Sequence, residues 1–219
     1  MPGKSRFGSP YDAALHLLDR QVIDRDGLLV CKVDDVELVE DGSRLRATAL
    51  LAGRAALLPR LGAFLLRYWE RLGPEEADRR QPYRIPLRAV AEVTSAVQLR
   101  VAREDLLVRA VDEPGRHTLA ELLRTGVRRA DGRAVGDVLD VRLDGEQRVA
   151  GLIVGPGRPG SLLGYDRSAD QGPAVVRAVV RWLHRHARYV RWEQLGPLDW
   201  ERSVVTVTGE LEPVRPASG

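Results

Sequence analysis

The chain has 219 residues, of which 44% are hydrophobic and 30% charged, a composition typical of a globular protein. Acidic and basic residues are interspersed and the net charge is only +3, so strong binding to arbitrary nucleic acid is not expected. The sequence has no run of 18 apolar residues and no apolar core near its N-terminus, which predicts neither a transmembrane helix nor a signal peptide. The single cysteine, Cys31, excludes an intrachain disulfide and favours a reducing compartment, so we expect a cytoplasmic protein.

A segment near the N-terminus recurs in the second half of the chain. Residues 17–38 match residues 122–143 at an offset of 105, with 10 of 22 positions identical. Because a duplication of this kind repeats a folding unit, it predicts two domains, residues 1–112 and 113–219. We expect the two domains to be related by a pseudo-twofold axis.

Each copy begins with the signature of a β-hairpin. Asp26-Gly27 in the first copy and Asp131-Gly132 in the second supply the positive-φ residue that a tight turn requires, and alternating apolar residues follow. In the strand after the turn, the apolar spacing changes from three residues to two, which indicates a bulge near Asp35 and Asp140. We expect both carboxylates to be structural and to accept hydrogen bonds from nearby backbone.

Further strands follow in the same order in both copies. A third strand is predicted over 45–52 and 148–154, a later one around 85–87 and 190–192, and a valine-rich one over 95–101 and 203–208. Five or six short strands in each half suit a small closed barrel.

Between the third and the later strand, each copy has a helical pattern. These helices are predicted over 63–72, which ends before Gly73-Pro74, and over 173–188, which begins with a proline. The second pattern has a cationic face opposite a valine-rich face, so it either packs on its own barrel or docks to an acidic partner or an anionic membrane surface. The candidate partner-binding residues on this helix are Arg177, Arg181, Trp182, Arg185 and Arg188.

The repeated pattern LL...V.D.DG..V.KV.DV.L, with IPLRAV downstream, resembles the PRC-barrel family. This module is shared by the H subunit of purple-bacterial photosynthetic reaction centres and the small-subunit ribosome maturation factor. The resemblance implies a mainly β chain of two small PRC-type β-barrels in tandem, and the helix that each copy inserts is a departure from the family pattern. Members of the family serve as docking and scaffolding modules with no shared catalytic motif, so the resemblance implies no catalytic residue. The first copy departs from the family with Cys31, where many members have a small residue, as the second copy has at Gly136.

Residue types with catalytic or ligand-binding potential do not form a recognisable site. Residues 155–160 match the GxGxxG pattern, but their two prolines and their place in a β-repeat predict a surface loop. The acidic run at residues 34–41 would send its side chains to both faces of a strand, so we interpret it as a solvated strand and turn. His184 and His186 point apart on a helix and cannot share one metal ion. We therefore expect no enzyme, no cofactor and no metal site.

The expected function is that of a non-enzymatic adaptor or scaffold that binds a protein partner of unknown identity. Peripheral association with the inner face of the cytoplasmic membrane and homodimer formation are both compatible with the sequence. The alternative is an RNA- or ribosome-associated protein, which the resemblance to the maturation factor permits. An RNA-binding protein needs a contiguous basic stripe with exposed aromatic residues, whereas an adaptor needs an exposed apolar patch.

Overall fold

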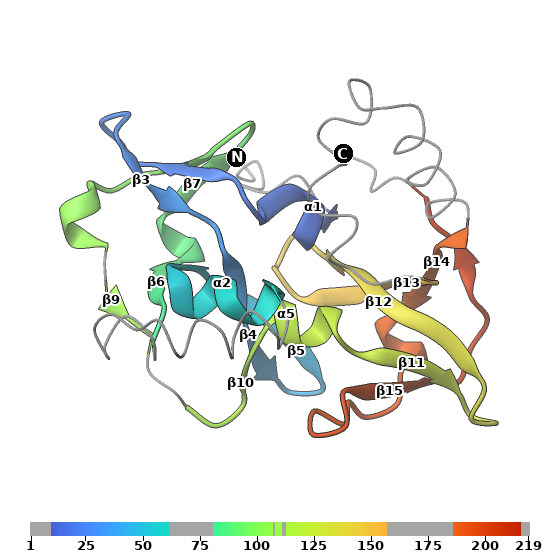
Figure 1. Ribbon diagram of the computed structural model, residues 1–219. Coiled ribbons are helices and arrows are strands. Elements are labelled where there is room, and N and C mark those ends of the chain that lie inside the picture. The colour runs from blue at the N-terminus through green and yellow to red at the C-terminus, as the bar shows by residue number, and fades with distance from the viewer. Residues whose placement is uncertain (1–9, 62–80, 107, 111–112, 157–185, 216–219) are drawn as a thin grey trace. The chain divides into compact units, whose positions relative to one another are not determined.

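The computed structural model describes residues 10–61, 81–106, 108–110, 113–156 and 186–215 (Figure 1). These residues are mainly β, as predicted, with short helices between strands. The chain divides into two compact units, one with Met1–Gly8 and His16–Ala120 and the other with Ser9–Leu15 and Glu121–Gly219. No helix among the described residues is long and apolar enough to cross a membrane.

Unit 1 contains two sheets. One has the strand order β10-β4-β5-β6-β9 and the other the order β3-β2-β8-β7. The strands are β2 (Gln21–Ile23), β3 (Leu29–Lys32), β4 (Asp35–Asp41), β5 (Arg44–Ala52), β6 (Tyr83–Pro86), β7 (Val90–Val93), β8 (Val97–Leu99), β9 (Val108–Arg109) and β10 (Arg116–Thr118). The helical segments are α2 (Arg54–Leu61) and the 3-10 turns η1 (Leu87–Ala89) and η2 (Arg103–Asp105).

Unit 2 contains one sheet with the strand order β15-β11-β12-β13-β14-β16, and β1 also pairs with β12. Its strands are β1 (Tyr11–Asp12), β11 (Gly126–Arg129), β12 (Ala134–Leu143), β13 (Val149–Gly155), β14 (Arg188–Arg191), β15 (Val204–Val207) and β16 (Glu212–Pro213). A 3-10 turn, η5 (Trp192–Gln194), follows β14. The short helices α1 (Ala13–Leu17) and α5 (Leu119–Leu123) contain the points at which the chain passes from one unit to the other.

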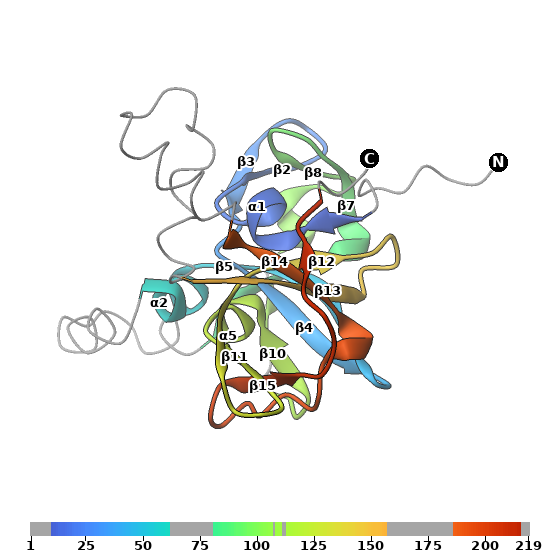
Figure 2. The same cartoon turned by 90° about the vertical axis from the view of Figure 1, so that its right-hand side faces the viewer.

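The same strand pairings recur in the two units. Strand β2 forms a hairpin with β3 and runs parallel to β8, while β11 forms a hairpin with β12 and runs parallel to β15 (Figure 2). In both units the third strand of the repeat then pairs antiparallel with the strand before a 3-10 turn, as β5 with β6 and β13 with β14. The repeated apolar positions therefore specify the same register twice. Among the described strands these pairings do not close a barrel, so the tandem barrels stay a prediction.

The buried residues of the two copies correspond as well. Val33 and Val138 are both fully buried, and their N–H groups donate to the carbonyl oxygens of Arg20 at 2.9 Å and Thr125 at 3.0 Å. The core of unit 1 includes Leu17, Val22, Val36, Leu38, Leu50, Ile85, Val90 and Val97. The core of unit 2 includes Leu122, Val127, Val141, Leu143, Leu152, Val154, Val190 and Val205.

The tight hairpin turns are confirmed. Gly27 has φ of 81° and Gly132 has φ of 83°, a region in which residues with a Cβ are strained. The predicted bulge is also present in unit 2, where the β12–β13 register shifts between Val138 and Asp140. In unit 1 the corresponding irregularity in the β4–β5 register lies between Glu37 and Leu38.

The structure describes little of the two regions in which the inserted helices are predicted. The helix predicted over 63–72 lies outside the described residues, and helix α2 at Arg54–Leu61, before that range, was not predicted. The helix predicted over 173–188 also lies almost wholly outside them. Its predicted end is wrong, because Arg188 begins strand β14, where its backbone pairs with Val154.

Candidate functional site

Strands β1 and β10, here called the leading strands, stand directly before the short helices α1 and α5. Strand β10 begins the second copy of the repeat, yet it pairs antiparallel with β4 of the first copy, with Thr118 opposite Glu37. Strand β1 begins the first copy, yet it pairs with β12 of the second, with Asp12 opposite Arg142. Figures 1 and 2 show β10 beside β4. Each copy therefore adds its leading strand to the sheet of the other copy, a reciprocal exchange.

The exchange explains the boundaries of the two compact units. Unit 1 takes residues up to Ala120 from the start of the second copy, and unit 2 takes Ser9–Leu15 from the start of the first. The exchanged segments are short, so their stability must come from what they contact in the sheet that receives them.

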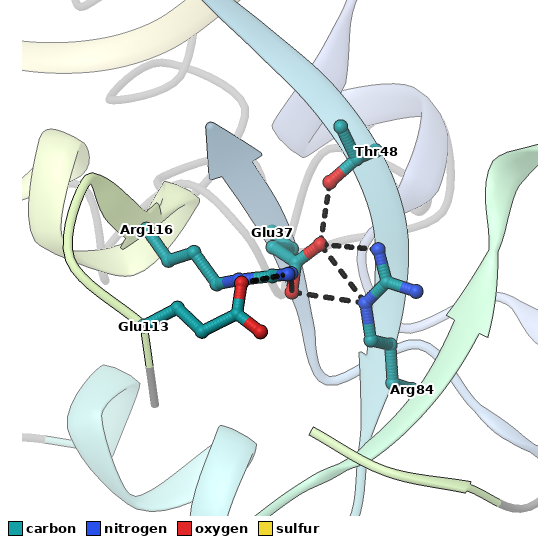
Figure 3. A network of polar contacts seen from close by, with 5 residues as sticks. All are labelled: Glu37, Thr48, Arg84, Glu113 and Arg116. Carbon is teal, nitrogen blue, oxygen red and sulfur yellow. Dashed lines mark hydrogen bonds and ion pairs between the residues drawn. The ribbon is translucent and has the colours of Figure 1, made fainter. Parts of the chain in front are cut away.

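The first of these contacts is centred on Glu37 of β4 (Figure 3). Only 5% of its side chain is exposed. Its carboxylate accepts hydrogen bonds from Arg84 on β6, with Nη2 at 2.7 Å and Nε at 3.0 Å, and from Arg116 on β10, with Nη1 at 2.9 Å. The Thr48 hydroxyl also donates to it, and Arg116 bonds Glu113 at 2.9 Å as well. Glu37 thus joins the leading strand to two strands of its new sheet.

These partners keep Glu37 ionised. Burial alone would raise the pKa of its carboxyl, but the hydrogen bonds from Arg84 and Thr48, together with the charge of Arg84, outweigh burial and lower the pKa. A buried charge is tolerated when it is paired and its lone pairs are satisfied, and the hydrogen bonds from Thr48, Arg84 and Arg116 meet that condition here.

Arg142 of β12 occupies the position in the second copy that matches Glu37. Its side chain is 9% exposed and forms a bidentate ion pair with Asp12 of the leading strand β1, at 2.7 Å from Nε and 3.1 Å from Nη2. Its guanidinium also lies 5.1 Å from the centre of the Tyr189 ring, a cation–π contact. Tyr189 matches Arg84 at the offset of 105. The two units therefore use opposite charges at one site of the repeat.

Asp35 and Asp140, two positions after the matched valines Val33 and Val138, anchor the helices that follow the leading strands. Asp35 Oδ1 accepts the N–H groups of Val36 at 2.8 Å and Ala120 at 3.0 Å. Because the first N–H groups of a helix have no partner within it, this carboxylate caps α5 from a distant part of the sequence.

Asp140 does the same for helix α1. Its carboxylate accepts the N–H groups of Val141 at 2.6 Å, Ala14 at 2.8 Å and Leu15 at 3.0 Å. Burial and the nearby charge of Asp12 raise its pKa to about 7, although the three backbone hydrogen bonds act in the opposite direction. The predicted structural role of both aspartates is confirmed, but their helical partners were not predicted.

The interpretation of residues 34–41 as a solvated strand is wrong at its centre. Asp35 and Glu37 are both buried, and each contacts the start of the second copy, Asp35 through the N–H of Ala120 and Glu37 through Arg116. The apolar neighbours of Glu37 and Arg142 are Val and Leu in both copies, while the residue between them changes sign. Alternation places that residue on the opposite face of the strand, so the pattern alone does not show whether it is buried.

The structure describes one of the five candidate partner-binding residues of the predicted helix and so does not test them as a group. Arg177, Arg181, Trp182 and Arg185 lie outside the described residues. Arg188 lies in β14, half-buried, with Nη1 donating to the carbonyl oxygen of Ala187 at 2.9 Å.

The tip of the β2–β3 hairpin exposes two leucines. Leu28 is 47% exposed and Leu29 is 57% exposed. Asp24 holds the turn below them by accepting the N–H groups of Asp26 at 3.0 Å and Leu28 at 2.8 Å. The matching residues of the second hairpin are Arg133 and Ala134. The two hairpins thus share a backbone and differ in the chemistry of their tips.

Groups that could carry chemistry are few in the described part of the chain. No cluster of three or more His, Cys, Asp or Glu residues there could hold a metal ion. Burial, with a contribution from the charge of Asp34, raises the pKa of the Cys31 thiol to about 11, so this cysteine is a poor nucleophile at neutral pH.

Comparison of the chain with protein-family models gives no match, and comparison with curated proteins gives none either.

Proposed function

We propose that this protein is a non-enzymatic adaptor, built from two PRC-barrel-like modules, that binds a protein partner in the cytoplasm. The proposal is supported by the buried charged residues, which make contacts that hold the fold together. Glu37 and Arg142 attach the leading strands, and Asp35 and Asp140 cap the helices that follow them. These side chains are held by contacts within the fold, and the accessible surface is then what can meet a partner.

The observation that carries the proposal is the exposed leucine pair of the β2–β3 hairpin. Two adjacent leucines that are about half exposed gain no stability from that exposure, and apolar side chains grouped at a surface mark contact sites. The second hairpin forms the same turn with Arg133 and Ala134, so leucines are not needed to fold it. Exposed Arg25 and Lys32 flank the leucines, which gives the apolar-centre and polar-rim pattern of protein interfaces.

The predicted partner-binding residues supply a second contact in this proposal. Arg177, Arg181, Arg185 and Arg188 would favour an acidic surface, either on the protein partner or on anionic lipid at the inner face of the membrane, and Trp182 would add an apolar contact. The leucine pair selects a partner with an apolar pocket, and the arginines add charge complementarity.

A capture experiment with matched hairpin variants tests the proposal. Full-length tagged protein, the variant Leu28→Ser/Leu29→Ser and the control Arg133→Ser/Ala134→Ser are incubated with extract from the native cell. We expect the wild type and the control to retain the same protein, and the leucine variant to lose it. Retention by all three would contradict the role of the leucines, and retention that RNase abolishes would favour the RNA-associated alternative.

A further inference from the structure

We infer that the opposite charges of Glu37 and Arg142 decide which leading strand each sheet accepts. Strand β10 carries Arg116 and meets Glu37, and strand β1 carries Asp12 and meets Arg142. The two ion pairs Glu37–Arg116 and Asp12–Arg142, here called the charge code, are complementary. They select the exchanged arrangement over one in which each copy keeps its own leading strand.

The backbone cannot make this choice. Each leading strand pairs antiparallel with the matching strand of the other copy, β10 with β4 and β1 with β12, through hydrogen bonds that do not depend on side chains. The caps cannot make it either, because Asp35 and Asp140 offer the same carboxylate to the helix that follows. The side chains of Glu37 and Arg142 carry charges of opposite sign, so they can discriminate between the two leading strands.

The cost of the wrong pairing is greatest in unit 2. If β10 returned to its own copy in the register that it has beside β4, Thr118 would stand opposite Arg142, and the guanidinium of Arg116 would reach Arg142 as it now reaches Glu37. Arg142 is largely buried, so water would screen the repulsion of the two guanidinium groups poorly. Asp140 also lies near Arg142, but its carboxylate already accepts three backbone N–H groups.

In unit 1 the wrong pairing would bring Asp12 to Glu37. Arg84 would partly offset this repulsion, since it faces Glu37 from β6, but the carboxylate would lose the hydrogen bond from Arg116. Errors in the two units are linked, because a leading strand placed in the wrong sheet leaves the other sheet without its own. One arrangement alone satisfies both pairs, because every other placement of the leading strands brings like charges together or leaves a buried charge without its partner.

The charge code can be removed while an ion pair is kept. In the full-length variant Asp12→Arg/Arg142→Glu, both sheets present an acid and both leading strands present an arginine. The control Asp12→Glu/Arg142→Lys keeps the original signs and the cation beside Tyr189. Each isotope-labelled protein is unfolded in denaturant, refolded, and compared by amide NMR at Ala14 and Ala120, whose N–H groups report the two caps.

We expect one set of resonances for the wild type and for the control, and two sets for the reversed variant, because either leading strand then fits either sheet. A neutral variant, Asp12→Asn/Arg142→Gln, is measured beside it in case the reversed charges prevent folding, and it should also show two sets. A single set with wild-type positions in whichever of these two variants folds would overturn the inference. A sizing column shows whether a second set comes from a dimer exchanged between chains, which would equally support loss of the charge code.

Discussion

Glu37 and Arg142 stand at the same position of two copies of one repeat, 105 residues apart, and carry opposite charges in buried ion pairs. Their partners, Arg116 and Asp12, come from strands that begin the other copy. A buried ion pair is stable only when both members are in place. The position of each charged side chain therefore depends on a residue about 80 to 130 positions away in the sequence, Glu37 on Arg116 and Arg142 on Asp12. This long-range dependence leads to specific expectations for stability.

Replacing Glu37 with Gln should destabilise the protein by about 3 kcal/mol, since Arg84 and Arg116 would then share a buried site with no carboxylate between them. Glu92 on β7 is exposed, so Glu92→Gln serves as the control and should change stability by less than about 0.5 kcal/mol. Denaturant unfolding of both variants measures the difference. Equal midpoints for the two would show that Glu37 does not hold β10.

The Asp12–Arg142 pair should show strong coupling in a double-mutant cycle. The variants Asp12→Ala and Arg142→Ala each leave one charge without its main partner, whereas the double variant removes both charges. We therefore expect the sum of the losses in unfolding free energy of the two single variants to exceed the loss of the double variant by about 1–3 kcal/mol. Additive losses would mean that the two side chains act independently.

Gly132→Val should destabilise the protein by more than about 1 kcal/mol, because the β-branched residue is strained at a φ of 83°. No heavy atom lies within 4 Å of a Cβ built at Gly132, so the effect comes from the backbone alone. Gly132→Asn tests this cause, since Asn tolerates the left-handed region better than other residues with a Cβ. A Val variant as stable as the Asn variant would refute the argument.

Asp140 should make stability fall as pH rises through neutrality. The pKa of its carboxyl is raised to about 7 in the folded protein, so folding favours the protonated form. The contribution of Asp140 to stability is therefore fully present below its unfolded pKa of about 4, and it is lost as pH rises through 7. Glu37 behaves in the opposite way, because its lowered pKa gives a contribution that disappears only when pH falls below about 4.

The free energy of unfolding of the wild type, measured between pH 5 and 8, should fall relative to that of Asp140→Asn. The histidines cancel in this difference because both proteins contain them. Asp140 is partly accessible to water, which makes the change smaller than for a fully enclosed acid. A difference that is flat, or that rises with pH, would contradict the raised pKa.

The local parts of the fold could be predicted from sequence because their signals are local. Asp26-Gly27 and Asp131-Gly132 determine their own turns, and the third strands at 45–52 and 148–154 follow from apolar patterning close to the observed β5 and β13. The leading strands had no such signal. Strands of two or three residues have too little alternation to show a period, and their pairing depends on a distant sheet.

The candidate site was missed for the same reason. Glu37 alternates with core residues, so the sequence indicates that it points away from Val36 and Leu38 but does not show that a second strand covers it. Its partners Thr48, Arg84 and Arg116 come from three other strands, so its setting depends on tertiary structure. The predicted end of the helix at Arg188 failed because an amphipathic pattern does not show where a following strand begins.

The reciprocal exchange is tested most directly by cross-strand nuclear Overhauser effects in the full-length chain. The exchange predicts contacts between the backbones of Thr118 and Glu37 and between those of Asp12 and Arg142. A sample mixed from labelled and unlabelled protein establishes that these contacts lie within one chain. Contacts from Thr118 to Arg142 and from Asp12 to Glu37 in their place would show that each copy keeps its own leading strand, and would contradict the exchange.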